Sequence, residues 1–206
     1  TTAAAPASSG GAAAPKSKGI ALAPVYMGSE SELSLLFPRI GQKRDATTKA
    51  KALQELRDYF AKPLEVKKAQ VEALAHFLYL YQSKLHYDNT PRVRSASLEC
   101  CEQAILQVPK AFSTLVSQQP ELLGMMLCGR ADPASDVCRA AVKVAEALKT
   151  IEDSSSLVNQ GMWAYVERIL AYGKPMNMHQ DLFQKKSDGS KLSEKQEEEL
   201  EERFVR

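Results

Sequence analysis

Apolar residues recur at steps of three and four along most of this chain, and that period limits the fold to packed helices. The clearest case is the stretch from Gly41 to Phe60, whose apolar stripe consists of Ala46, Ala50, Leu53, Leu56 and Phe60. Such a stripe is typical of an amphipathic helix with one buried face. Alternation with a period of two, which would indicate strands, is missing from the sequence. The sequence therefore predicts an all-α protein.

Caps, prolines and glycines mark where the helices begin and end. Ser29 and Glu32 have the spacing of a capping box. Asp45, Thr90 and Ser135 are suitable N-cap residues, because their side chains can accept from the free N–H groups of a first turn. The expected helices span residues 29–41, 45–60, 64–86, 90–109, 111–117, 122–128, 136–151, 156–172 and 193–206.

These caps also suggest a repeat. Asp45, Thr90 and Ser135 are 45 residues apart, and so are three basic residues, Lys49, Arg94 and Arg139. This period is that of HEAT and armadillo helix pairs. Val93–Ala96 and Cys138–Ala141 look like the V-R-x-A start of a second HEAT helix, in which the arginine commonly bonds an aspartate of a neighbouring repeat. The sequence thus predicts a HEAT/armadillo-like right-handed stack of antiparallel helix pairs, an α-solenoid fragment, with Arg94 and Arg139 in its scaffold.

The composition divides the chain into four parts. Residues 1–24 are rich in Ala, Gly, Ser and Pro and are expected to be disordered, although Ile20–Met27 could form an extended arm that docks on the first helices. Residues 25–174 make the helical domain, 175–192 a polar linker and 193–206 the start of a further helix. The chain opens on Thr1 and stops inside a charged helical pattern, as a piece of a longer protein would.

No set of residues with a catalytic or metal-binding pattern stands out. The three histidines are far apart and are expected to be core or rim residues, and the four cysteines form no C-x-x-C. Trp163 and Tyr165 are assigned to the core. No apolar stretch is long enough for a membrane span, and no signal peptide is recognisable. The net charge of +2 is too small to indicate nucleic-acid binding by itself.

One local concentration of charge is informative. Between Arg39 and Lys51 the sequence holds five basic residues and one acid, Asp45. These cations fall on a short loop and on the exposed side of the following first turn. Such an arrangement suits the ribose-phosphate backbone of RNA. Solvated charges that only aid solubility are the alternative.

Residues 31–60 carry a more specific pattern. Ser31–Ile40, a short basic loop, and then D-x-T-T-K-x-K-A-x-Q-E from Asp45 to Glu55 resemble the N-terminal segment of the listerin family of RING-type E3 ubiquitin ligases. His86–Arg94 and the acidic segment Glu197–Phe204 are also similar to that family. The resemblance covers residues 25–206; it departs from the family at Pro38, which interrupts the first helix, and it does not include residues 1–24.

The resemblance implies a function in ribosome-associated quality control. This part of the ligase would dock in the cytosol on the large ribosomal subunit near the sarcin–ricin loop and on the nascent-chain export mediator factor. A RING outside this chain would bind zinc and the E2 ubiquitin-conjugating enzyme, and the chain itself would need no cofactor. The candidate contact residues are Gln42, Lys43, Arg44, Thr47, Thr48 and Lys49. The alternative is a general HEAT-repeat adaptor of the transport-receptor or tubulin-binding type.

Overall fold

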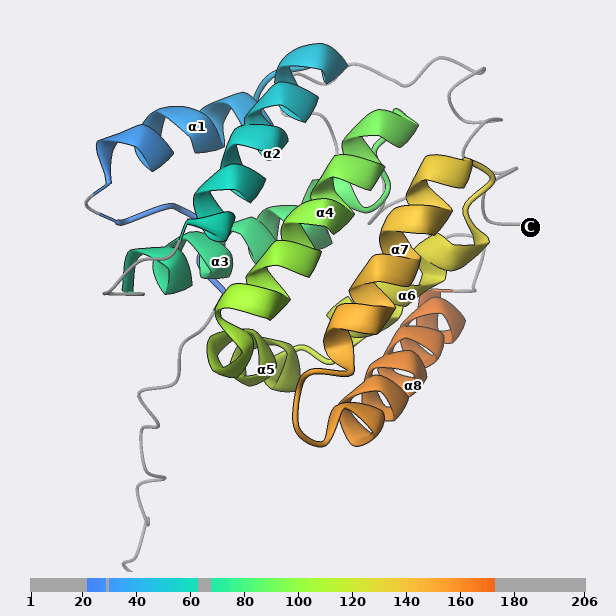
Figure 1. Ribbon diagram of the computed structural model, residues 1–206. Helices are drawn as coiled ribbons and strands as arrows, with labels where there is room; N and C mark the ends of the chain where they lie inside the picture. The colour runs from blue at the N-terminus through green and yellow to red at the C-terminus, as the bar shows by residue number, and fades with distance from the viewer. Residues whose placement is uncertain (1–21, 29, 63–67, 173–206) are drawn as a thin grey trace, which may run out of the picture.

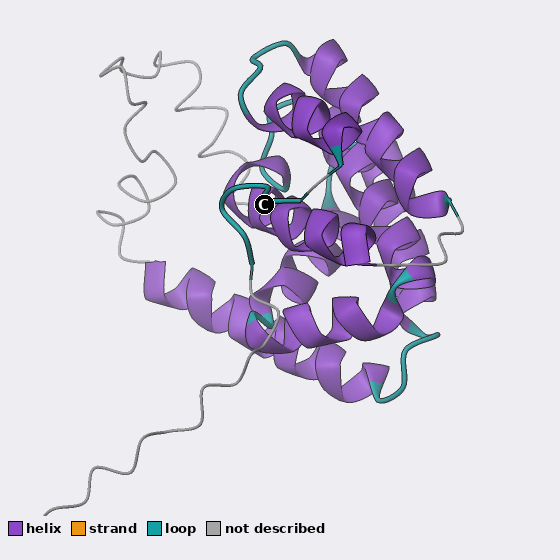
Figure 2. Ribbon diagram, turned by 90° about the vertical axis from the view of Figure 1, so that its left-hand side faces the viewer, coloured by secondary structure: helices purple, strands orange, loops and turns teal. Residues whose placement is uncertain are grey.

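A computed structural model describes residues 22–28, 30–62 and 68–172 of the chain. In these residues the structure contains helices, turns and loops and no strand (Figures 1 and 2). The helices are α1 (Ser31–Gly41), α2 (Ala46–Ala61), α3 (Lys68–Leu80), α4 (Pro91–Gln107), α5 (Pro109–Gln118), α6 (Glu121–Cys128), α7 (Ser135–Leu148) and α8 (Ser154–Tyr172). The predicted all-α class is confirmed.

The helices form two layers. In the inner layer α2, α4 and α7 run side by side and parallel, so that their N-termini lie at one edge of the protein, the upper edge in Figure 1. The outer layer contains α3, α6 and α8, and α6 packs directly on α8. From α3 onward, outer and inner helices alternate along the chain as α3, α4, α6, α7 and α8, with the short α5 inserted between α4 and α6, as in the helix pairs of a solenoid. The structure is therefore the expected α-solenoid fragment.

Burial follows the predicted stripes. Leu53, Leu56 and Phe60 of α2 are 0% exposed. The ring of Phe60 lies 6.2 Å from that of Phe77 in α3, and Phe77 in turn lies 6.3 Å from Tyr81. Full burial of one such side chain stabilises the fold by roughly 1.5–3 kcal/mol. The apolar stripe predicted within Gly41–Phe60 is therefore buried where α2 packs between α1 and α4.

The segment before α1 packs as an extended arm, as expected for Ile20–Met27 in the part that is described. The backbone N–H of Ala23 donates to the carbonyl of Ala75 over 3.3 Å, and Nδ1 of His76 donates to the carbonyl of Ala23 over 2.7 Å. The ring of Tyr26 lies 4.9 Å from that of Phe37. His76 is accordingly a satisfied core-edge histidine, as predicted, and burial lowers its pKa.

Several helix ends differ from the prediction. Thr90 occupies the N-cap position of α4 with Pro91 in the first turn, but its side chain makes no capping bond. Ser135 is already the first residue of α7, and Ala134 is the N-cap. In both turns an aspartate two residues before the N-cap accepts from the backbone N–H of the cap residue: Asp88 accepts from Thr90 and Asp132 from Ala134, both over 2.9 Å.

Two further expectations need correction. The single helix expected over residues 64–86 is α3 followed by a π-helical turn, Tyr81–Leu85. Trp163, assigned to the core, is 69% exposed, because α8 packs on α6 through the opposite side, where Gly161 and Tyr165 lie. Tyr165 is half-buried.

Some predictions fall outside the described residues. They concern the disorder of residues 1–21, the cap at Ser29, the helix start at residues 64–67, and the linker and further helix within 173–206. Among the helices that the structure describes, none is both long enough and apolar enough to cross a membrane.

Candidate functional site

The basic loop between α1 and α2 is held in place from both sides. On the α1 side, the guanidinium of Arg39 makes two bonds to the carboxylate of Glu55 in α2, of 2.7 and 2.9 Å. From beneath, Nζ of Lys84 donates to the carbonyl of Gly41 over 3.0 Å. The N–H of Gln42 donates to the carbonyl of Pro38 over 3.0 Å. The loop is therefore a rigid corner, although most of its side chains are exposed.

Asp45 closes the corner as the predicted N-cap of α2. Its carboxylate accepts from the N–H of Thr48 over 2.7 Å and from that of Thr47 over 3.4 Å. The hydrogen bonds from the side chain and backbone of Thr48 lower the pKa of Asp45, and the N–H of Thr47 and the charge of Lys51 add to this. The acid of the corner is thus used internally, and the remaining charged groups of the loop, Lys43 and Arg44, are exposed cations.

The cap makes the stability of α2 depend on pH. A carboxylate with a lowered folded-state pKa contributes stability above its unfolded value of about 3.9, and the contribution is lost as the pH falls through the folded value. We expect Asp45→Ala to lower the melting temperature at pH 7, and the difference from the unmodified protein to shrink below about pH 4. Asp45→Asn, which can still accept the bonds, serves as the control, and thermal unfolding by circular dichroism from pH 3 to 7 is the measurement.

Lys49 differs from the other candidate residues. Its Nζ lies 2.6 Å from Oδ2 of Asp88, and the side chains of the pair are 20% and 12% exposed. The same carboxylate accepts from the N–H of Thr90 at the start of α4. Lys49 therefore joins α2 to the turn before α4. Among the candidate residues, Gln42, Lys43, Arg44 and Thr47 are exposed, and Thr48 is half-buried.

A second ion pair repeats this arrangement one helix further on. Arg94 in α4 binds the carboxylate of Asp132 through two bonds of 2.8 and 2.9 Å, and its Nη1 donates to the carbonyl of Asp88 over 2.6 Å. The predicted scaffold role of Arg94, a bond to an aspartate of the neighbouring repeat, is confirmed. Arg139 instead pairs with Asp136 of its own helix, and both side chains are largely exposed.

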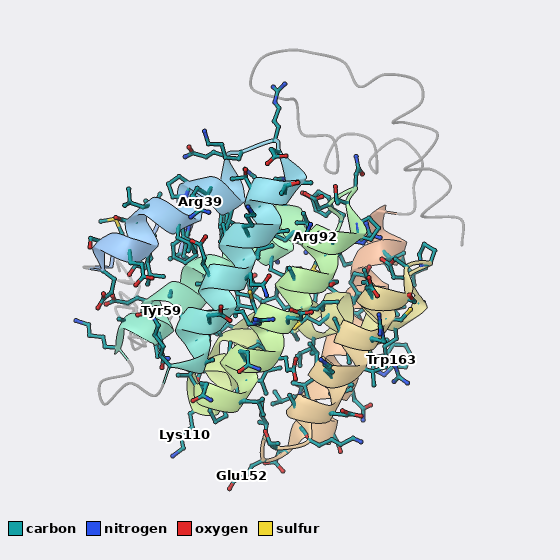
Figure 3. All side chains as sticks on the ribbon, turned by 45° about the horizontal axis from the view of Figure 1, so that its top comes forward. Arg39, Tyr59, Arg92, Lys110, Glu152 and Trp163 are labelled. Carbon is teal, nitrogen blue, oxygen red and sulfur yellow. The ribbon has the colours of Figure 1, made fainter. Side chains whose placement is uncertain are left out.

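The N-termini of the inner helices extend the basic corner along one edge. Arg92, in the first turn of α4, is exposed on the same edge as the corner (Figure 3), and Arg130 is exposed in the turn Gly129–Ala131 that leads into the start of α7. Helix N-termini add partial positive charge there. Neither arginine was predicted from the sequence, although each stands within four residues of an aspartate, Asp88 or Asp132, in the turn before an inner helix. Asp88 and Asp132 are engaged in caps and ion pairs, and the exposed Asp136 in the first turn of α7 is paired with Arg139, so this edge carries a net positive charge.

A groove of about 900 Å³ lies on the outer face, between the N-terminal arm, the π-helical turn and α8. It contains His76 and His86, and burial lowers the pKa of His86 to about 4. Nδ1 of His86 donates to the carbonyl of Tyr81 over 3.1 Å. Within the described residues no cluster of three or more His, Cys, Asp or Glu side chains could hold a metal ion. The groove has no catalytic arrangement, so the basic edge is the stronger candidate site.

A family model described as the N-terminal domain of E3 ubiquitin-protein ligase listerin matches residues 29–206. The comparisons with curated proteins and with solved structures gave no match. The matched range includes every helix described above, from α1 to α8.

Proposed function

This chain belongs to the listerin family, as the pattern in residues 31–60 predicted, and on that premise we propose that it is the ribosome-docking part of an E3 ubiquitin ligase. The proposed setting is ribosome-associated quality control in the cytosol, where such a ligase ubiquitinates stalled nascent chains on large ribosomal subunits. The proposed partners of this part are ribosomal RNA near the sarcin–ricin loop and the nascent-chain export mediator factor.

The rigid basic corner is the observation that supports ribosome docking. Lys43 and Arg44 are exposed on a loop whose backbone is tied to α1 and to Lys84, and whose only acid caps α2. Cations held by a rigid element lose little conformational entropy on binding. RNA helices are recognised mainly through their shape and their phosphates and 2′-hydroxyls, and the exposed hydroxyl of Thr47 can donate to a phosphate oxygen.

Lys49 has a supporting role in this proposal. Its ammonium is committed to Asp88, so it holds the first turn of α2 in place against α4 and is not itself a primary contact. The proposed contacts are therefore Gln42, Lys43, Arg44 and Thr47, with Thr48 partly accessible. Arg92 and Arg130 would extend the contact along the edge.

Ubiquitin transfer is assigned to another part of the ligase. A RING needs a dense array of Cys and His ligands for zinc. Among the described residues, Cys100 and Cys101 are fully buried and Sγ of Cys100 donates to the carbonyl of Leu53 over 3.0 Å. Burial raises the pKa of both thiols, which disfavours the thiolate that a metal requires. Zinc and the E2 enzyme would bind at the RING outside this chain.

Charge reversal at the corner tests the proposal. Lys43→Glu with Arg44→Glu is expected to weaken binding to isolated large ribosomal subunits about tenfold or more, because two attractive phosphate interactions become repulsive. The slope of log Kd against log salt concentration should also become shallower, by about 1 for each phosphate that the variant no longer binds. Cosedimentation with large subunits between about 50 and 200 mM salt is the measurement.

A matched control has the same change in net charge at a distance from the corner. Lys110→Glu with Lys143→Glu alters two exposed lysines, on α5 and α7, and is expected to keep both the affinity and the salt dependence. If both double variants bind large ribosomal subunits with the same affinity, the basic corner does not bind ribosomal RNA. Binding to tubulin or to transport cargo, with no binding to ribosomal subunits, would favour a general HEAT-repeat adaptor.

A further inference from the structure

The groove on the outer face is formed by segments that lie far apart in the sequence. It is lined by the N-terminal arm and α1, by α3 and the π-helical turn Tyr81–Leu85, and by α8. Glu121 of α6 ties these parts together, because its Oε1 accepts from Nε2 of Gln82 over 2.9 Å and lies 3.5 Å from Nη1 of Arg168 in α8. The volume of about 900 Å³ is that of a ligand-binding pocket, and a preformed site loses little conformational entropy on binding.

The π-helical turn is an observation that points to a site independently of the volume. The N–H of His86 donates to the carbonyl of Tyr81 over 3.3 Å, five residues back, and Oγ of Ser83 donates to the carbonyl of Tyr79 over 2.8 Å. Such single π-turns within helices are frequently found at functional sites. Here the turn brings Ser83, Lys84 and His86 together in the groove.

The lining of the groove is aromatic, and none of the described residues in it is an aspartate or glutamate. Its two cations are Lys84 and Arg168. Burial lowers the pKa of His86 to about 4, so this ring is neutral at pH 7. Arg168 shares its charge with Glu121, whereas Nζ of Lys84 donates to the uncharged carbonyl of Gly41. The groove therefore presents aromatic surface beside a lysine whose charge no described carboxylate offsets.

Large apolar side chains are exposed on both sides of the groove. Val25 of the N-terminal arm is 61% exposed and Ile169 of α8 is 43% exposed, and both line the groove. They extend its apolar surface outward, as is typical of sites that bind protein partners. A small molecule held in the hollow would leave these side chains in water, whereas a peptide laid along the groove covers them.

We infer that this groove binds a peptide segment of a partner protein in which a large apolar side chain stands beside a carboxylate. The apolar side chain enters the aromatic hollow. The carboxylate binds Lys84 and replaces the carbonyl of Gly41 as its acceptor, because charge-assisted hydrogen bonds are roughly twice as strong as neutral ones. The charge of Lys84 thus selects an acidic segment over a basic one. This inference does not depend on the proposed ribosome docking.

Selection of phage-displayed random peptides of about 12 residues, long enough to fill a recognition groove, tests the inference without ribosomes. We expect the peptides selected on the unmodified chain to share Leu, Phe or Trp beside Asp or Glu. Val25→Asp and, separately, Ile169→Asp should each weaken binding of the best selected peptide about tenfold or more, because a carboxylate then faces the bound apolar side chain. Fluorescence anisotropy with the labelled synthetic peptide gives the Kd.

Each of these variants has a matched control nearby in the sequence. Met27→Asp on the arm and Leu170→Asp on α8 add the same charge at residues that are 87% and 72% exposed and lie outside the groove. Both controls should bind the peptide as the unmodified chain does. Circular dichroism of all four variants checks that the fold persists, and the two sides of the groove are tested independently of each other.

Lys84→Gln tests the contribution of the charge. It is expected to weaken peptide binding about fivefold at about 50 mM salt and less at about 300 mM, because salt screens the interaction of exposed charges. Lys143→Gln makes the same charge change at an exposed position of α7 outside the groove and should bind normally. Selection of basic peptides, the absence of any enriched motif, or equal binding by Ile169→Asp and Leu170→Asp would overturn the inference.

Discussion

Replacing Asp132 with alanine is expected to lower the free energy of unfolding by about 3–5 kcal/mol, as is found when one partner of a buried ion pair is removed. The side chain of Arg94 is 6% exposed, and its guanidinium makes two bonds to Asp132. Without the carboxylate, this charge would be left in the interior with only the carbonyl of Asp88 as an acceptor. The N–H of Ala134 at the start of α7 would lose its acceptor as well.

Urea denaturation of two comparison variants tests whether the unpaired buried charge of Arg94 causes this loss of stability. Asp136→Ala removes the partner of Arg139 in an ion pair whose side chains are 65% and 75% exposed, and it is expected to cost less than about 0.5 kcal/mol. Adding Arg94→Met to Asp132→Ala should recover part of the loss, because no buried charge then remains unpaired. Equal costs for Asp132→Ala and Asp136→Ala would show that Arg94 finds water and that the ion pair does not hold the inner helices together.

This ion pair also shows how far a sequence can predict the scaffold. The V-R-x-A pattern and the interval of 45 residues from Lys49 predict that Arg94 belongs to the scaffold. Its partner could not be identified from those patterns, because Asp132 follows a short 3₁₀ turn and is brought to α4 only by packing. Lys49 was read as a surface cation for a related reason. A lysine in a basic first turn gives no local sign of a partner, and the turn containing Asp88 covers it only in the folded stack.

The candidate site likewise has one part that the local sequence predicts and another part that depends on the packing of the helices. Asp45, the basic loop and the exposed threonine follow from local sequence, because capping and short loops are decided within a few residues. The rest of the edge depends on the parallel packing of α2, α4 and α7, which brings Arg92 and Arg130 to the side of the corner. Lys84 could not be assigned to the loop either, since it binds the carbonyl of Gly41 from 43 residues away. Long-range contacts of this kind have no local signal.

The misassignment of Trp163 has a different physical origin. Periodicity shows that α8 is helical but cannot say which of two apolar sides is buried when both carry large residues. The decision is made by Gly124 and Gly161, which let α6 and α8 approach closely. Their side of α8 is buried against α6, while Trp163 and Leu170 remain exposed. A glycine on each of the two neighbouring outer helices, α6 and α8, was the available sequence signal for this crossing.

Gly124→Ala provides the direct test of that crossing. On an exposed helix the change stabilises by about 1 kcal/mol, but here the sign should reverse. A Cβ at position 124 would lie 2.3 Å from Cβ of Tyr165 and 2.7 Å from the carbonyl oxygen of Gly161. Both groups are fixed on α8, so the helices must separate. We expect a loss of about 2 kcal/mol, the typical cost of overpacking, with faster hydrogen exchange concentrated in α8.

Gly41→Ala is the appropriate comparison, because the added Cβ would meet only the end of the Leu80 side chain, at 3.2 Å. A side-chain terminus can rotate away, whereas the backbone of α8 cannot move without opening the contact with α6. The two variants add the same methyl group, so a difference in urea midpoint between them measures the closeness of the crossing itself. Stabilisation by Gly124→Ala, or an equal effect of the two changes, would mean that α6 and α8 are not packed at this distance.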